Sequence, residues 1–440
     1  MKALCREFSW SNGFKLFYEH LPSKLVSIGL LVKGGSSAQN ANESGVAHFL
    51  EHAIFQGSQK YSRENIEKLS DKLNLGINAY TSKEHSLFSI DCLYDKNLSN
   101  VKSGIKLIHD LVTSPLLLKK GLAEEKQNIK SEYFSHYNKM FQSKNFKEFL
   151  VEVGHRISLG AKGLGNFVLG NLKDIENMSE ERLKNYHRRV FVPRNMRLIV
   201  TGGLHRRSGD VGKIKTMVDE LNLNPSHTQK INFDSHITTT ESQKLQKFIS
   251  QKPIIIPSIS PKISTISLFF EAPSYKNTEK YIRFLLLERI LNDYNGIGKG
   301  IYLGSNICGY DIRHRNFIYT PYNYIGLGGI LLQSSESNTK KFNANFIGKY
   351  LEILRNKIND REIKKAKNKL IFDLFNSEGT PNSLMNLRAV QYLYYDKKLS
   401  KRYLIDLINK CDGRELSDVM EKDIIGKFKR SECNLVLMNG

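Results

Sequence analysis

The chain has 440 residues, 40% of them hydrophobic, which is too long for one ordinary hydrophobic core and suits two domains of roughly 200 residues. Its 66 Lys and Arg against 44 Asp and Glu give a formal charge of +22, but these residues are spread along the chain instead of clustering as a nucleic-acid-binding patch would. No apolar run approaches the ~20 residues of a membrane span, and the five dispersed cysteines contain no Cys-x-x-Cys pair, which indicates reduced thiols and excludes a cysteine zinc site.

The N-terminal 22 residues alternate like strands around a turn at Asn12-Gly13, and they contain no signal-peptide core. We therefore expect a cytoplasmic protein, or an organelle-matrix protein whose presequence is absent from this chain. Residues 24–35 are β-rich, apolar and closed by two glycines, which predicts a buried strand. The polar cluster at 42–44 offers helix N-caps for a helix over 46–55.

The first half continues as mixed α/β structure. A second helix is predicted near 62–74, and the alternation over 76–94 predicts a pair of strands. Helical spacing follows at 98–115 and at 121–140, and residues 195–204 form a buried strand that ends in glycines.

Between about 205 and 262 the chain becomes polar and rich in proline, which predicts a linker region. The second half then repeats the order of strand, helices and strand, with strands at 264–273, 325–333 and 433–438, a helix at 277–296, and further helices between 338 and 428. We therefore predict two α/β domains of similar build, at 1–230 and 263–440, joined by a linker at 231–262.

The segment "GVAHFLEHAIFQGS" places His48, Glu51 and His52 on one predicted helix. Side chains four apart on a helix lie above one another, with Cβ atoms ~5–6 Å apart, so the two imidazoles can converge on one metal ion. Glu51 is placed to take a proton from a water molecule there. A catalytic zinc site needs a third protein ligand, and two histidines at this spacing can also be merely structural.

The helix predicted over 121–140 offers candidates for that ligand. Glu125 and Glu132 are two turns apart and share one face, whereas Glu124 points elsewhere. Either Glu125 or Glu132 could complete a His-His-Glu site, and spacing does not choose between them. The alternative is an exposed charged helix, because Lys126 and Lys130 are also present.

The His-x-x-Glu-His motif is the inverzincin signature, and the chain resembles the pitrilysin-type zinc metallopeptidases, in the short branch that includes mitochondrial processing peptidase and its bacterial homologues. The resemblance covers most of the chain: the motif and the strands before it, "INAYTSKEHSLFSI", "LVTSPLL", and "NFVLGNLKDIENMSEERLKNYHRRVFVPRNMRLIVTGGL". It implies an α+β fold of two similar α/β-sandwich domains, with mixed, largely antiparallel sheets flanked by helices, forming a clam-shell.

The resemblance also implies roles for individual residues. His48 and His52 match the two zinc ligands, and Glu51 matches the general base. Glu132 matches the third ligand and Glu125 the acid that supports the site. The resemblance further implies that Asn78 and Ala79 form the strand edge that pairs with the substrate backbone.

In the second half, members of this family carry an Arg and a Tyr seven residues apart that hold the substrate. Tyr310 falls on the tyrosine, but Leu303 stands where the arginine is expected, and Lys299 is out of register. Either this chain pairs with a family member that supplies the Arg/Tyr pair, or the alignment slips in this stretch.

The resemblance thus implies a Zn²⁺-dependent endopeptidase acting on extended, unfolded or presequence-like peptides. The alternative is a non-catalytic or half-site subunit of a heterodimeric peptidase. We expect a homodimer or heterodimer, with no membrane span and no specific nucleic-acid partner.

Overall fold

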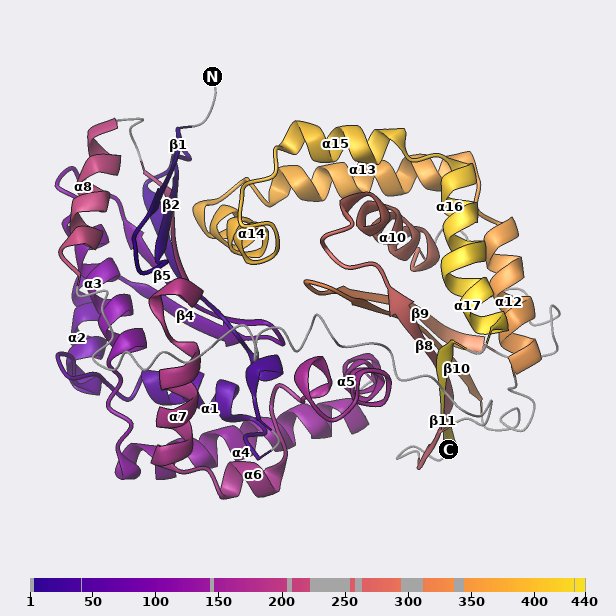
Figure 1. The fold of residues 1–440 in the computed structure, drawn as a ribbon, viewed down its shortest axis with the longest axis horizontal. Coiled ribbons are helices and arrows are strands. Elements are labelled where there is room, and N and C mark those ends of the chain that lie inside the picture. Colours follow the sequence, from indigo (N-terminus) through magenta and orange to yellow (C-terminus); the bar gives the residue numbers. More distant parts are fainter. Residues whose placement is uncertain are drawn as a thin grey trace. The chain divides into compact units, whose positions relative to one another are not determined.

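The computed structural model describes residues 4–40, 42–142, 146–203, 208–221, 254–257, 263–293, 312–335, 344–430 and 432–439. The chain forms two compact units (Figure 1). Unit 1 comprises the described parts of 1–134, 162–239 and 375–398. Unit 2 comprises those of 135–161, 240–374 and 399–440.

The described strands of unit 1 form one mixed sheet. Its order is β1 (Cys5–Ser9), β2 (Lys15–Glu19), β6 (Met196–Gly202), β3 (Leu25–Lys33), β5 (His85–Leu93) and β4 (Gly76–Thr81). The β2–β6 pair is parallel and every other pair is antiparallel. Among the described strands β4 pairs with β5 alone, so β4 lies at an edge of the sheet.

The central strand β3 is buried on both faces, which explains its nearly continuous apolar sequence. On one face, Ile28, Leu30 and Val32 join the main core. The helices of unit 1 are α1 (Val46–Ile54), α2 (Arg63–Leu73), α3 (Ser99–Thr113), α4 (Lys119–Gln142, in this unit up to Phe134), α6 (Leu172–Glu176), α7 (Glu180–Val190) and α8 (Ser208–Asp219). On the opposite face, Leu31 packs against Met385 of α14 (Pro381–Tyr394).

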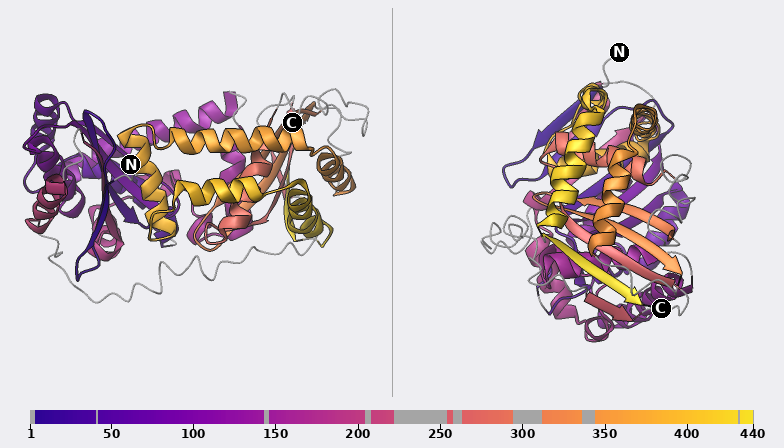
Figure 2. Two further views of the ribbon diagram at one scale, coloured as in Figure 1. Left: turned by 90° about the horizontal axis from the view of Figure 1, so that it is seen from above. Right: turned by 90° about the vertical axis from the view of Figure 1, so that its right-hand side faces the viewer.

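Unit 2 has a second mixed sheet, in the order β7 (Ile254–Pro257), β11 (Cys433–Asn439), β8 (Ile263–Ala272), β10 (Gly326–Ser335) and β9 (Ile312–Pro321). Only the β7–β11 pair is parallel among the strands described there. Its helices are α5 (Phe146–Leu159), α10 (Thr278–Leu291), α12 (Ala344–Asn356), α13 (Asp360–Asn376), α15 (Lys401–Lys410), α16 (Gly413–Val419), a π-helical turn (Met420–Ile425) and α17 (Gly426–Lys429). Figure 2 shows α13 and α15 side by side, and Lys367 donates to the carbonyl of Asn409 between them.

The predicted α+β class with mixed, largely antiparallel sheets is confirmed. The continuous ranges 1–230 and 263–440 differ from the observed units, because α5 belongs to unit 2 and α14 to unit 1. Each helix buries apolar residues against the sheet of that unit, and local periodicity does not reveal which sheet a helix covers. Of the predicted linker at 231–262, only β7 is among the described residues.

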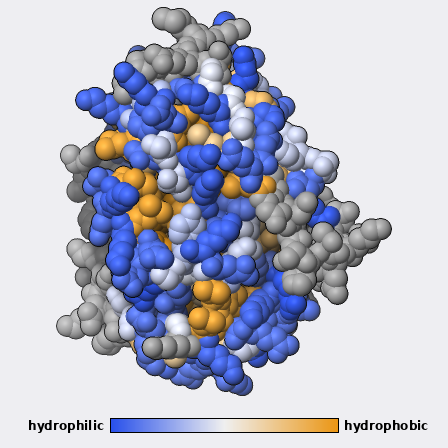
Figure 3. Space-filling view, turned by 90° about the vertical axis from the view of Figure 1, so that its left-hand side faces the viewer, coloured by the Kyte–Doolittle hydropathy of each residue, from blue (hydrophilic) through white to orange (hydrophobic). Residues whose placement is uncertain are grey.

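In the part of the chain that the structure describes, no helix is long and apolar enough to cross a membrane. The four described cysteines, Cys5, Cys92, Cys411 and Cys433, are free thiols. The face of the molecule in Figure 3 is mostly hydrophilic, with hydrophobic residues in small separate groups.

Candidate metal centre

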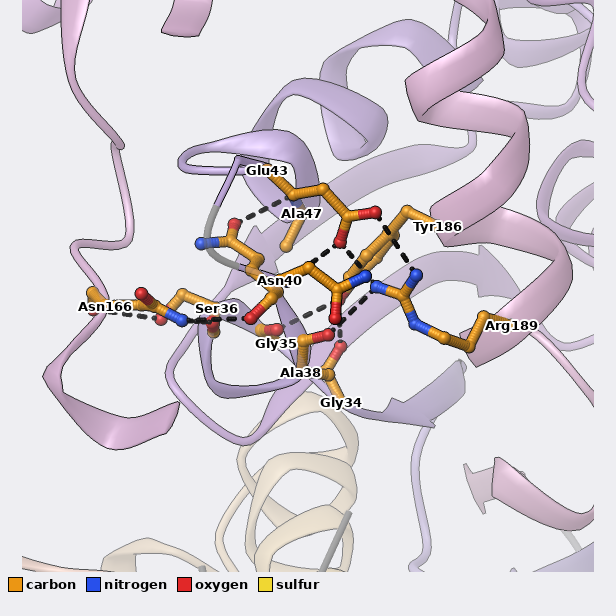
Figure 4. Close-up of polar contacts among 11 residues, drawn as sticks. Gly34, Gly35, Ser36, Ala38, Asn40, Glu43, Ala47, Asn166, Tyr186 and Arg189 are labelled. Atoms are coloured by element: carbon orange, nitrogen blue, oxygen red, sulfur yellow. Dashed lines mark hydrogen bonds and ion pairs between the residues drawn. The ribbon is translucent and has the colours of Figure 1, made fainter. Parts of the chain in front are cut away.

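The start of α1 is fixed by contacts with α7 (Figure 4). Arg189 of α7 donates to the Glu43 carboxylate at 2.5 Å and to the carbonyl of Ala38 at 3.1 Å. The hydroxyl of Tyr186, one turn earlier in α7, donates to the carbonyl of Gly35 at 2.9 Å. These buried contacts fix the segment 35–43, which leads into α1, and so fix the position at which the helix begins.

The polar cluster at 42–44 does not supply the predicted side-chain cap. The N-cap residue is Gly45, which lies in the left-handed region with φ of 84° and has no side chain to act as a cap. The side-chain oxygen of Gln39 instead accepts a hydrogen bond from the N–H of Ala47 at 3.1 Å. A Cβ at Gly45 would lie 2.9 Å from the carbonyl oxygen of Leu169. Glycine is therefore required here both by its dihedral angle and by the close backbone of the neighbouring segment.

The predicted helix is confirmed, and α1 presents two histidines on one face. Its apolar residues Phe49, Leu50 and Ala53 are buried in the core. The imidazole rings of His48 and His52 lie with their centroids 4.8 Å apart, as their spacing of four requires. His48 is buried, whereas the side chain of His52 is one-quarter exposed.

The long helix α4 brings both candidate glutamates to this face of α1. The carboxylate of Glu132 lies 3.6 Å from Nε2 of His48 and 3.3 Å from Nε2 of His52. Glu125 lies on the other side of the second ring, 3.2 Å from Nδ1 of His52. The two glutamates left equal by spacing therefore have different positions, and only Glu132 faces both Nε2 atoms.

One ligand atom from each of His48, His52 and Glu132 lies within 4.8 Å of the other two. Two imidazole nitrogens and one carboxylate oxygen are a ligand set of catalytic zinc sites. Nδ1 of His52 contacts a carboxylate, which is how a metal-binding histidine is commonly oriented. The donor atoms of this cluster therefore fit a zinc ion.

Burial and neighbouring charge act differently on the two histidines. Burial lowers the pKa of His48 and outweighs the opposing effect of Glu132. Burial also acts to lower the pKa of His52, but its hydrogen bonds with Glu125 and Glu132 outweigh burial and raise the pKa. In the metal-free chain a proton is therefore held preferentially on His52, between the two carboxylates.

Glu51 lies on α1 between His48 and His52 and is not part of the cluster that could hold a metal ion. Burial raises the pKa of its carboxyl group, opposed by a hydrogen bond with the Thr81 side chain and by His52. The Thr81 hydroxyl also lies 3.1 Å from that of Ser86 on the neighbouring strand. Thr81 thus links the proposed base to the sheet, a role that the sequence analysis did not identify.

Thr81 ends strand β4, which also contains Asn78 and Ala79. These two residues pair with Ser89 and Phe88 of β5, and the side chain of Asn78 is exposed. Among the described strands β5 is the only neighbour of β4, and the N–H of Ala79 donates to the side-chain oxygen of Asn78 at 2.9 Å.

The substrate-binding residue predicted in the second half of the chain is Tyr310. Tyr310, together with Lys299 and Leu303 before it, falls outside the described residues. The metal cluster and Glu51 all belong to unit 1.

Comparison with known proteins identifies the family. Residues 15–162 match the profile of "Insulinase (Peptidase family M16)", and residues 177–370 match that of "Peptidase M16 inactive domain". The mitochondrial-processing peptidase subunit beta of Saccharomyces cerevisiae is 24% identical over 91% of this chain and 84% of that protein.

A probable zinc protease, PqqL of Haemophilus influenzae, is 25% identical over 64% of this chain and 29% of its own length. A crystal structure of a protease from Helicobacter pylori has the same fold, with a TM-score of 0.80, 15% identity and full coverage of both chains. The resemblance drawn from the motifs is confirmed, and the chain belongs to peptidase family M16.

Proposed function

We propose that this protein is a zinc-dependent endopeptidase that hydrolyses extended or unfolded peptides, including presequence-like ones. The observation that carries the proposal is the convergence of His48, His52 and Glu132, with Glu51 on the same helix face. Its membership of a peptidase family and its similarity to a probable zinc protease support the same activity.

In this proposal, His48 and His52 bind the ion through Nε2, Glu132 binds through its carboxylate, and Glu125 holds the ring of His52. A zinc ion bound there supplies a Lewis acid that polarises the scissile carbonyl and acidifies a water molecule. Glu51 accepts the proton of the attacking water and passes it to the leaving amine. The hydrogen bond with Thr81 orients Glu51 for this transfer.

The substrate lies along β4 as an added strand. Asn78 and Ala79 offer it backbone hydrogen-bonding groups, and the N–H of Ala79 exchanges its present bond with the Asn78 side chain for one with the substrate. Thr81 at the end of the strand contacts the general base. This mode of binding needs an extended backbone, so folded proteins are poor substrates. It sets no sequence preference by itself, because backbone groups are common to all residues.

The test is Glu51→Gln, which preserves shape and removes the base. We expect cleavage of an unstructured peptide to fall at least ~100-fold, the lower range for a general base, while zinc remains bound. Glu64→Gln, an exposed acid on α2, is the matched control and is expected to act like the unaltered chain. Normal turnover by Glu51→Gln, measured at equal zinc content, would contradict the proposal.

A second candidate is a half-site or non-catalytic subunit of a heterodimeric peptidase. It is favoured by Leu303, which stands where the family's arginine is expected, and by the relative named a subunit of a processing peptidase. Native mass spectrometry and a cleavage assay of the isolated chain separate the two. Zinc binding without cleavage, with activity appearing on addition of a family member that carries the Arg/Tyr pair, would support the subunit. The cytoplasmic location remains a prediction.

A further inference from the structure

Behind the metal cluster, a chain of polar side chains runs from Arg63 through Gln56 and Glu125 to His52. We infer that Gln56 is a positioning residue, which holds Glu125 in the orientation that directs Nε2 of His52 toward Glu132 and so sets the affinity for the metal. This inference rests on the proposed zinc site and adds to it a residue that the sequence motif did not reveal.

The two oxygens of Glu125 have separate partners. Oε2 lies 3.2 Å from Nδ1 of His52, and Oε1 accepts a hydrogen bond from the amide Nε2 of Gln56. The residue Glu125 is only 7% exposed, so few water molecules can replace a lost partner. The side chain of Asn128 also bonds to this carboxylate, so Gln56 is one of three side chains that hold Glu125 in its orientation.

The carboxylate of Glu125 orients the ring of His52 by its contact with Nδ1 at 3.2 Å. A carboxylate beside Nδ1 favours a proton there, which leaves the lone pair of Nε2 for the metal. His48 differs, because its Nδ1 is buried and has no hydrogen-bond partner among the described residues. Within this cluster, His52 is therefore the histidine whose ring is oriented by a polar chain.

The direction of the Gln56 amide is itself fixed. Its carbonyl oxygen lies 3.4 Å from Nη1 of Arg63, and the same Nη1 donates to Glu124 at 2.9 Å. A flipped amide would place oxygen against the Glu125 carboxylate and the NH₂ group against the guanidinium, and both contacts would be unfavourable. Arg63 therefore keeps the donor end of Gln56 toward Glu125.

Gly121 makes room for this side chain on α4, one turn before Glu125. A Cβ at Gly121 would lie 3.3 Å from both Cγ and Oε1 of Gln56, closer than ordinary van der Waals contact. An alanine at this position would therefore require the Gln56 side chain to shift. The backbone of Gln56 already closes the end of α1 by bonding to the carbonyl of Ala53, so its side chain is not needed for that purpose.

The test measures zinc affinity of the full chain by competition with a chromophoric chelator. Gln56→Met keeps the volume and loses the donor, and we expect roughly 10-fold weaker binding, the lower end of the range for partners of metal ligands. Gln59→Leu, an exposed glutamine in the same loop, is the matched control and is expected to leave affinity unchanged. His52→Ala marks the loss of a ligand.

Gly121→Ala tests the same inference without removing a polar group. Alanine favours the helix by up to ~1 kcal/mol, so the thermal midpoint of the metal-free protein should not fall. Zinc affinity should still fall several-fold, because Gln56 is displaced. If Gln56 had a purely structural role, zinc affinity would fall only where the stability of the protein falls. Gly121→Ala therefore tests the inference even if Gln56→Met folds poorly.

Two negative results have different meanings. If His52→Ala loses zinc while Gln56→Met and Gly121→Ala bind it within about twofold of the unaltered chain, the inference is wrong and the proposed function stands. If the unaltered chain binds no zinc, or binds it independently of His52, the proposed function fails, and the inference fails with it.

Discussion

Unit 1 contains two networks of charged side chains that differ in burial. In the first, two Nε2 atoms and the half-exposed carboxylate of Glu132 converge within 4.8 Å. In the second, the fully buried guanidinium of Arg388 donates to Glu19 at 2.6 Å and 3.2 Å, to Glu378 at 2.9 Å and to the amide oxygen of Gln391 at 3.0 Å.

The two networks differ in how closely their charged groups pair. The hydrogen bonds that Arg388 donates are accepted by side chains of the same unit. Glu19 also accepts a hydrogen bond from Lys398. That network joins α14, late in the chain, to strand β2 of the first sheet. The metal cluster instead directs its donor atoms at a common point. In this cluster the Glu132 carboxylate lies 3.6 Å and 3.3 Å from Nε2 of His48 and of His52, whereas the contacts of Arg388 with Glu19 are 2.6 Å and 3.2 Å.

The largest expected effect comes from breaking the buried network. Arg388→Met leaves the Glu19 carboxylate buried with Lys398 as its remaining cation, and we expect the free energy of unfolding to fall by about 3–5 kcal/mol. Urea unfolding measures it. The double variant with Glu19→Gln should recover part of the loss, because the uncompensated charge is gone. A loss below about 1 kcal/mol in the single variant would show that this network does not hold α14.

Removing a residue of the metal cluster should change zinc affinity strongly and the stability of the protein little. Glu132→Gln removes a half-exposed carboxylate, whose ion pairs are worth at most about 1 kcal/mol, so the stability of the metal-free protein should hardly change. Zinc affinity should fall by more than the roughly 10–100-fold that removing a ligand's hydrogen-bond partner costs. Equilibrium dialysis measures it, with Glu64→Gln as control. Unchanged zinc binding would exclude Glu132 as a ligand.

His109, a buried histidine that belongs to neither network, makes the free energy of unfolding depend on pH. Burial lowers the pKa of His109 to about 4, with Asp110 acting to raise it and Lys60 to lower it. The unfolded chain, with a pKa near 6.5, therefore binds the proton more readily. Stability from this group is present above pH 6.5 and is lost as pH falls toward 4, by roughly 1–3 kcal/mol. His109→Gln should flatten this part of the curve of unfolding free energy against pH. An identical curve would contradict the prediction.

The smallest expected effect concerns the link between the metal cluster and the sheet. Thr81→Val keeps the shape and loses the hydroxyl that bonds to Glu51, a charge-assisted bond of about 1–2 kcal/mol. Turnover at saturating peptide should fall roughly 5–30-fold, with zinc affinity unchanged. Thr81→Ser should restore most of it. If Thr81→Val turns over the peptide as fast as the unaltered chain, the hydrogen bond of Thr81 with Glu51 does not contribute to turnover.

The sequence by itself determined the elements and the motif. The helix that carries His48 and His52, the strand pair around Asn78, and helix α4 follow from periodicity over a few residues, because helices and strands repeat at 3.6 and 2 residues. The resemblance then selected Glu132 over Glu125 as the third ligand, which stays a prediction; the two carboxylates lie beside different nitrogens of His52.

Only the tertiary structure decided which distant groups meet. Spacing left Glu125 and Glu132 equal, since both lie on one helix face and their separation appears only when α4 packs against α1. Thr81 reaches Glu51, and Gln56 reaches Glu125, across contacts between elements that no local pattern encodes. The same holds for α14, which covers the first sheet although it lies far along the chain. Local periodicity specifies an element and its apolar face, while its partner is chosen by packing over the whole chain.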